Sequence, residues 1–155
     1  MKRKMKSNSL FVALMLLISI TTVQAQSNTG KMLYEDGECN ITVYLVDFTE
    51  DGVYRIHFRS HGNYNINTAK LVSGITHYNN ESRYFLSDLT AKMNASYGGK
   101  TYECNIMGTS GINYKDGDMW SYYIFSDVLE ETPEFNGGNV ILTVTDLCNN
   151  VWSRK

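Results

Sequence analysis

Proline is almost absent from this sequence, and no apolar run is long enough to cross a bilayer as a helix. Pro133 is the only proline in 155 residues, which excludes proline-rich linkers. The longest apolar stretch covers residues 10–20, with Ser19 as its only polar side chain. These 11 residues are about half of what a membrane-spanning helix needs.

The short apolar stretch has the organisation of a secretory signal peptide. Four basic residues lie between positions 2 and 6, and small residues follow the apolar core up to Ala25. The sequence therefore predicts a leader over residues 1–25 and a mature chain that begins near Gln26. A leader this short and basic is typical of bacteria, so we expect export to the periplasm or the exterior, with no transmembrane segment after cleavage.

Positive charge is scarce outside the leader. Without residues 1–25 the chain would keep ten basic side chains against all 16 acidic ones, a formal net charge of −6. Nucleic-acid binding needs a basic surface that replaces the counterions of phosphate. We therefore expect no nucleic acid among the partners.

Catalytic and cofactor motifs are missing as well. The sequence contains no G-x-S-x-G, S-x-x-K, H-E-x-x-H or glycine-rich phosphate loop. His57 and His61 would point to the same side of a strand and could together bind a metal ion. A glycine follows them, however, and no carboxylate lies at the spacing that a third metal ligand needs. The sequence predicts no metal site and no cofactor, and it favours a binding protein over an enzyme.

Cysteine is rare, with three residues: Cys39, Cys104 and Cys148. In an exported chain, one disulfide and one remaining thiol are expected. Cys39 and Cys104 fall on the expected core faces of their strands and are the first choice of pair, with Cys148 as the rival partner for either. The alternative is that all three stay reduced and buried as small apolar residues.

Glycine and asparagine recur between runs rich in Val, Ile, Thr, Tyr and Phe. This pattern is typical of β-strands separated by turns. We expect an all-β chain whose residues 26–155 form a single antiparallel β-sandwich, immunoglobulin-like in general architecture. An up-and-down β-barrel is the alternative. The run Val144-Thr145-Asp146 resembles the final strand of many immunoglobulin-like bacterial modules.

One hairpin can be placed closely by its register. A two-residue turn at Gly98-Gly99 puts apolar residues on one face and polar residues on the other. The rival is a helix over residues 81–97, capped by Asn80 and Gly98, which would make the fold α+β. The pairs that the turn predicts are Tyr97 with Lys100, Ala95 with Tyr102, Met93 with Cys104 and Ala91 with Ile106.

Further strands follow from the same alternation. A turn at Asp51-Gly52 would pair Leu45 with Phe58 and Asp47 with Ile56. A third hairpin is expected around Asp116-Gly117. The last strand is expected over residues 140–145, with Val140, Leu142 and Val144 facing inward.

Aromatic residues are abundant, with 11 Tyr, 6 Phe and 2 Trp. Alternation over residues 120–125 places Trp120 and Tyr122 on one face of a strand and Tyr123 and Phe125 on the other. If one of these faces is exposed, its rings can bind sugars or a protein partner. The alternative is a central strand that is covered on both sides.

A second candidate surface combines Tyr44 with Arg55, His57 and Arg59. Arginine stacks on aromatic rings and donates hydrogen bonds to carboxylates, so this face is a possible ligand platform. The alternative is a solvated sheet surface held by cross-strand pairs.

Together these observations predict an exported, non-catalytic binding module of the bacterial envelope or exterior. It would recognise a glycan or a protein through aromatic residues and loops. One alternative is a small secreted hydrolase or enzyme inhibitor with its site in residues 61–82. Another is a structural subunit that assembles through an edge strand.

Overall fold

The protein is described by a computed structural model that covers residues 3–10, 12–20, 28–79, 85–113, 117–126 and 133–154. These residues form 15 strands and no α-helix, which confirms the predicted all-β class. The strands pair antiparallel into several sheets that do not close on themselves. The fold is therefore a β-sandwich of facing antiparallel sheets, and the barrel alternative is wrong.

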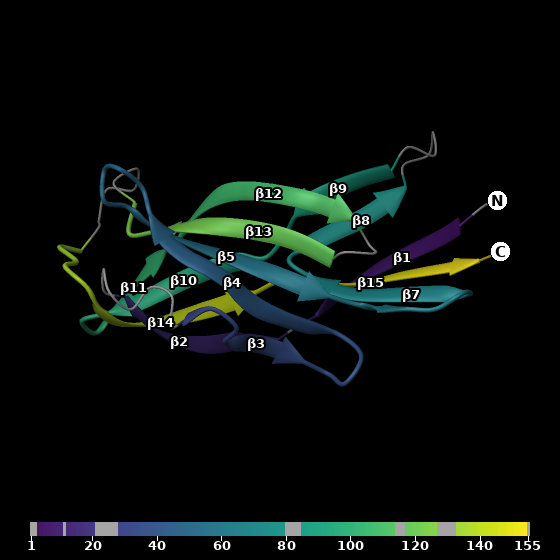
Figure 1. Cartoon of the computed structure of the whole chain (residues 1–155), viewed down its shortest axis with the longest axis horizontal. Helices are drawn as coiled ribbons and strands as arrows, with labels where there is room; N and C mark the ends of the chain where they lie inside the picture. Colours follow the sequence, from purple (N-terminus) through teal and green to yellow (C-terminus); the bar gives the residue numbers. More distant parts are fainter. Residues whose placement is uncertain are drawn as a thin grey trace.

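Two sheets face each other across the main core, and in Figure 1 the strands of the five-stranded sheet cross in front of β10, β14 and β2. The five-stranded sheet runs in the order β12 (Asn105–Asn113), β13 (Gly117–Ile124), β5 (Tyr54–His61), β4 (Asn40–Phe48) and β3 (Met32–Glu35). The facing sheet runs in the order β11 (Lys100–Glu103), β10 (Lys92–Tyr97), β14 (Gly138–Thr145) and β2 (Leu14–Ile20).

A further sheet and a separate hairpin extend the sandwich at one end. Asp146, at a φ of 59°, connects β14 to the C-terminal strand, and Arg3 pairs with Arg154, so the two ends of the chain lie side by side (Figure 1). The sheet runs in the order β1 (Arg3–Leu10), β15 (Leu147–Arg154), β7 (Thr68–Ser73) and β6 (Asn63–Tyr64), and the hairpin pairs β8 (Ile75–Asn79) with β9 (Phe85–Leu89).

Alternating apolar residues build the main core. Each strand presents every second side chain to the facing sheet, and burying a large aliphatic or aromatic side chain stabilises the fold by about 1.5–3 kcal/mol. The predicted inward side chains of β14 are all fully buried, as are three large residues on the inner face of β13: Val140, Leu142, Val144, Trp120, Tyr122 and Ile124.

The hairpin at Gly98-Gly99 is confirmed. Both glycines have positive φ, 60° and 78°, as a two-residue turn of this kind requires. The structure shows the predicted pairs Tyr97 with Lys100 and Ala95 with Tyr102. The predicted pair of Ala91 with Ile106 does not form, because β12 pairs with β13 instead. The helix alternative is wrong over residues 85–97, which form β9 and β10, and residues 81–84 lie outside the described residues.

The hairpin of β4 and β5 forms with a register different from the predicted one. A bulge between Val43 and Leu45 inserts one residue, and the loop holds three residues because Thr49 bonds to Val53. Beyond the extra residue, the inward and outward positions of β4 are exchanged. Val46 is therefore buried, and Asp47 lies opposite Arg55. The prediction that Leu45 lies opposite Phe58 and Asp47 opposite Ile56 is therefore wrong.

Two further predictions are tested by the pairing of strands. The third hairpin is confirmed, since β12 and β13 pair antiparallel and Asn113 lies opposite Gly117. Residues 114–116 of its turn lie outside the described residues. Residues 140–145 form a strand as expected but not the last one, because β15 follows and pairs with both β1 and β7.

The predicted disulfide is not observed, because all three cysteines are buried free thiols in different surroundings. Cys39 contacts the carbonyl of Lys70 on β7, whereas the backbone N–H of Cys104 bonds to Met93 on β10. Cys148 lies 2.7 Å from the hydroxyl of Thr76. Separate neighbours keep the three sulfur atoms in separate parts of the core, as the alternative of reduced, buried cysteines states.

The residues of the predicted leader occupy strand positions in the full chain. Residues 3–10 form β1 and residues 14–20 form β2, while residues 21–27 lie outside the described residues. Cleavage near Gln26 remains a prediction. In the described part of the chain, no helix is long and apolar enough to cross a membrane.

Candidate functional site

Strand β13 divides the predicted aromatic site residues between the core and the surface. Trp120 and Tyr122 are fully buried, because this side of β13 faces the opposite sheet. They pack with Phe58 at ring-centroid distances of 5.8 Å and 6.3 Å. Neither is part of the candidate site. Tyr123 points to the other face and is half-buried.

Phe125 lies in an aromatic cluster at the end of β13. Its backbone has a φ of 54°, which ends the alternation of the strand. The centroid of its ring lies 5.0 Å from the ring centroid of Phe135, 5.5 Å from that of Tyr102 and 5.9 Å from that of Tyr97. Such edge and tilted contacts stabilise packing, so we assign Phe125 a structural role.

The outer face of the five-stranded sheet brings the remaining predicted residues together. Direct cross-strand pairing aligns Asn105 with Tyr123, Tyr123 with Arg55, and Arg55 with Asp47. We call these four residues the outer row. His57 and Ser121 pair in the next outward-facing row, and Arg59 and Tyr44 follow, with the guanidinium 5.9 Å from the tyrosine ring.

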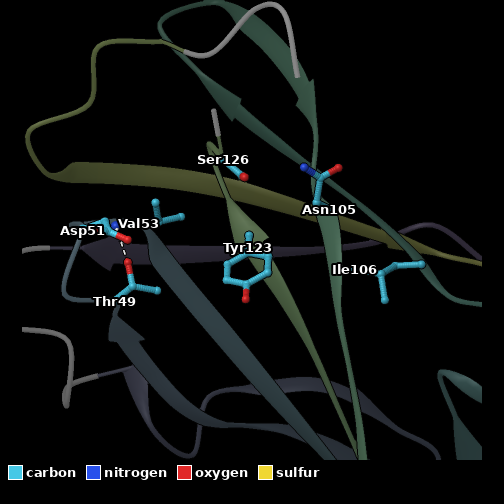
Figure 2. Close-up of a pocket in the computed structure, with 7 residues that line it drawn as sticks. All are labelled: Thr49, Asp51, Val53, Asn105, Ile106, Tyr123 and Ser126. Atoms are coloured by element: carbon cyan, nitrogen blue, oxygen red, sulfur yellow. Dashed lines mark hydrogen bonds between the residues drawn. The ribbon is translucent and has the colours of Figure 1, made fainter. Parts of the chain in front are cut away.

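A pocket of about 500 Å³ opens beside Tyr123. Figure 2 shows the tyrosine ring between the β4–β5 loop on one side and the start of β12 on the other. The walls combine one aromatic ring and two aliphatic side chains with hydroxyl, amide and carboxylate groups. The lining residues are Thr49, Asp51, Val53, Asn105, Ile106, Tyr123 and Ser126.

Asn105 offers the pocket an unused hydrogen-bond donor. Its side-chain nitrogen is buried, and it has no hydrogen-bond partner within the part of the chain that the structure describes. Buried polar groups are usually satisfied by protein, water or ligand. Ile106 beside it is 56% exposed, so a donor and an apolar surface lie at the same wall.

Asp47 organises the charged part of the outer face. Arg55 donates two hydrogen bonds to its carboxylate, 2.8 Å and 2.6 Å long, the bidentate geometry that makes such pairs strong. His57 Nε2 lies 3.3 Å from the same carboxylate. Burial raises the pKa of Asp47, but the hydrogen bonds from Arg55 and His57 outweigh it and hold the pKa below its ordinary value.

Ser121, His57 and Asp47 form a hydrogen-bonded chain. The hydroxyl of Ser121 lies 2.6 Å from His57 Nδ1, so a proton on Nε2 directed at Asp47 leaves Nδ1 to accept from the serine. Acyl hydrolases use such a chain together with N–H groups that stabilise an oxyanion. Ser121 lies on a strand that is paired on both sides, which directs its own N–H toward a neighbouring strand. We therefore interpret this chain as a rigid part of the surface.

A second hydrogen-bonded chain is buried where the sandwich meets the smaller sheets. His77 Nε2 lies 2.7 Å from Asp118 Oδ2, and its Nδ1 lies 2.7 Å from the hydroxyl of Ser87. Ser73 donates to the same carboxylate over 2.6 Å. Because His77 and Asp118 are 1% and 0% exposed while Ser87 is half-buried, only the serine approaches solvent. Nothing in the spacing of these residues along the sequence predicts this cluster.

The described residues contain no group of three or more His, Cys, Asp or Glu side chains arranged to hold a metal ion. The histidine pair noted in the sequence separates in the structure, because His57 bonds to Ser121 while His61 is exposed at the end of β5. Comparison with protein-family models, with curated proteins and with solved structures finds no match to this chain.

Proposed function

We propose that this protein is an exported, non-catalytic binding module of the bacterial envelope or exterior, and that it binds a glycan in the pocket beside Tyr123. The observation that carries the proposal is the pocket itself, where a half-buried tyrosine ring lies among hydroxyl, amide and carboxylate groups. Sugar rings present apolar faces and hydroxyl edges, and this combination of a flat ring with polar groups is suited to both.

The scaffold supports this proposal because it fixes the tyrosine in place. Tyr123 is held between Asn105 and Arg55 by pairing on both sides of its strand, and Arg55 is in turn held by Asp47. A ring that is already oriented loses little conformational freedom when a ligand binds. The loop residues Thr49 and Asp51 add polar groups at the rim, where variation changes specificity without disturbing the sheet.

The charges of the chain favour a neutral glycan over an anionic ligand. The mature chain would carry a formal net charge of −6. The described residues that line the pocket include Asp51 but no lysine or arginine. Arg55 is the cation of the outer row, and its charge is paired with that of Asp47. A phosphate or polyanion would therefore meet repulsion that a neutral sugar does not.

The test is a glycan array followed by titration calorimetry with the best ligand. Tyr123→Ala is expected to weaken binding about 5- to 30-fold, since a ring contact contributes roughly 1–2 kcal/mol. Tyr123→Phe should retain most of the affinity because it keeps the ring. Tyr44→Ala is the matched control, because Tyr44 is 46% exposed on the same outer face but does not line the pocket.

Two results would overturn the proposal. One is an array on which no glycan binds at millimolar protein, in which case capture of a protein by the same pocket becomes the explanation to test. The other is a ligand whose affinity falls equally in Tyr123→Ala and Tyr44→Ala, because such a ligand does not use the pocket.

A second candidate function is ester or amide hydrolysis at Ser87. The hydrogen-bonded order Ser87, His77, Asp118 favours it, because a buried carboxylate that holds a histidine in one tautomer activates a serine. A fluorophosphonate probe tests it directly. Hydrolysis predicts labelling that Ser87→Ala abolishes and Ser121→Ala leaves intact, whereas a folded chain that takes up no label rejects this function.

A further inference from the structure

The first two strands of the chain pair antiparallel with the last two. β1 pairs with β15 from Arg3–Arg154 to Leu10–Leu147, and β2 pairs with β14 from Leu14–Val144 to Ile20–Gly138. β2 is the edge strand of its sheet. The position that β2 occupies is bounded on one side by the backbone of β14 and on its inner face by the main core. We call this position the seat of β2.

This seat selects apolar residues at three alternate positions. Leu16, Ile18 and Ile20 point inward and are 7%, 0% and 0% exposed, whereas Met15 and Leu17 between them are 68% and 56% exposed. The three inward side chains belong to the main core. A strand in this position thus contributes to the core through every second residue.

Two side chains from outside the sheet hold the backbone of β2. The amide of Asn28 accepts from the N–H of Ser19 over 3.1 Å and donates to its carbonyl over 2.6 Å. Asn28 is fully buried. The ammonium of Lys31 donates to the carbonyl of Leu17 over 3.1 Å. All three contacts are with backbone atoms, so they recognise an extended strand whatever its side chains are.

Residues 1–25, which include β2, are the segment that the sequence predicts to be removed on export. Removal would leave the edge of β14 without hydrogen-bond partners and uncover the core beneath it. The residues that follow the predicted cleavage site, Gln26 to Gly30, are polar or small and offer no apolar replacement. Open, apolar edges of this kind associate with other strands.

We propose that the processed protein binds, in the seat of β2, an extended segment of a partner protein. That segment would run antiparallel to β14 and carry large aliphatic side chains at three alternate positions, and Asn28 and Lys31 would hold its backbone. This is strand addition to a sheet edge. It rests on the predicted processing and is independent of ligand binding at the pocket beside Tyr123.

The experiment begins with the full chain, so that no part is assumed to fold alone. A specific protease site is placed within residues 21–27, the folded protein is cut there, and a fluorescent synthetic peptide with the sequence of residues 3–20 is added as the probe. Fluorescence anisotropy and native mass spectrometry measure its exchange into the seat. We expect exchange at micromolar peptide, and an equal signal from a peptide carrying Leu17→Asp, whose altered side chain faces solvent.

A peptide carrying Ile18→Asp is the discriminating variant. Its charge would be buried in the core, so its affinity should fall at least about 10-fold. Asn28→Ala in the protein should weaken the unaltered peptide and the Leu17→Asp peptide by the same factor, whereas Thr29→Ala, a change at an exposed neighbour, should have no effect.

Equal affinity of the Ile18→Asp and Leu17→Asp peptides, or no exchange at all, overturns the proposal. So does an intact mass of the protein recovered from the envelope that still includes residues 1–20, because the seat then never opens. Self-association of the cut protein without peptide would identify a second copy of the chain as the occupant and overturn the assignment to a different partner.

Discussion

Asp47 shows how one residue decides what the outer face can do. Its carboxylate receives Arg55 in a bidentate pair and lies beside His57. Because all three side chains are partly exposed, the pair contributes less than a buried one, about 1 kcal/mol. The pair also holds Arg55 on the strand next to Tyr123, the aromatic residue that lines the pocket.

The pH dependence of stability follows from the lowered pKa of Asp47. A carboxyl group whose pKa is lower in the folded chain than in the unfolded chain stabilises the fold above its ordinary pKa, and it loses that contribution as the pH falls through the lowered value. Urea unfolding should show that Asp47→Asn removes about 1 kcal/mol of stability at pH 7. As the pH falls below the ordinary aspartate pKa of about 3.9, the difference between variant and parent should shrink.

Glu103→Gln, an exposed change on β11, serves as the control and should leave the curve unchanged. A destabilisation by Asp47→Asn that stays constant down to pH 2 would show that the carboxylate acts by packing and not by charge.

The buried thiols predict a measurable lack of reactivity. Burial raises the pKa of Cys104 to about 12 and raises that of Cys39 as well, and only the thiolate reacts readily. A colorimetric thiol reagent at pH 8 should label the native protein slowly and titrate three thiols in denaturant. A count of one thiol in denaturant would show that a disulfide forms in solution.

At the scale of elements, the sequence predicted those strands whose turns and alternation agree. The hairpin at Gly98-Gly99 was predictable because one turn sorts both of its strands into apolar and polar faces. The hairpin of β4 and β5 was predictable only as a hairpin. The bulge at Tyr44 reverses the faces beyond it. The predicted register placed the charged side chain of Asp47 opposite Ile56, and this mismatch was the sign that the register changes there.

The last strand was missed for a chemical reason. In β15 the side chains of Cys148, Asn150 and Trp152 point inward and are buried. Because the middle one is polar, the sequence does not show the apolar alternation that predicts a strand. The structure satisfies Asn150 completely, because it accepts from the N–H of His77 and donates to the carbonyls of Leu71 and Ile75. A buried polar residue of this kind depends on partners more than 70 positions away in sequence, which periodicity does not reveal.

The candidate site was predictable in part for the same reasons. Residue type and parity placed Arg55 and His57 on an outward face and put Tyr123 on the opposite side of its strand from Trp120 and Tyr122. They did not show which of the two sides is exposed, and the structure buries Trp120 and Tyr122 in the core. Asn105 and the loop residues of the pocket carry no signal in sequence, because they become neighbours only when β12, β13 and the β4–β5 loop come together.

The turn at Gly98-Gly99 makes a prediction about backbone conformation alone. A Cβ at Gly98 would meet no atom within 4 Å, so a substitution acts only through the positive φ. Gly98→Val should destabilise the fold by about 1–2 kcal/mol, whereas Gly98→Asn should be nearly neutral, because asparagine tolerates this conformation. Thermal unfolding monitored by circular dichroism compares the two variants, and equal melting temperatures would contradict the assignment of this turn.

At the scale of the whole molecule, stability should be distributed unevenly. β13 and β14 are each paired on both sides and bury their inner faces in the main core, whereas β6 has two residues and β9 pairs only with β8. Amides in central strands exchange through global unfolding and those at edges through local opening. In the full chain, in which β2 covers one side of β14, hydrogen exchange followed by mass spectrometry should therefore show the slowest exchange in β13 and β14 and faster exchange in β6 and β9. Uniform protection would mean that the smaller sheets unfold only together with the sandwich.

The separate burial of three reduced cysteines also sets a condition on biosynthesis. In an oxidising compartment the nascent chain can join any two of them, and each such crosslink would tether segments that the native fold keeps apart. In such a compartment, maturation would be a kinetic competition in which folding has to bury the thiols before oxidants reach them. Slow folding would leave chains trapped by non-native disulfides, and a reducing agent would return those chains to the productive route.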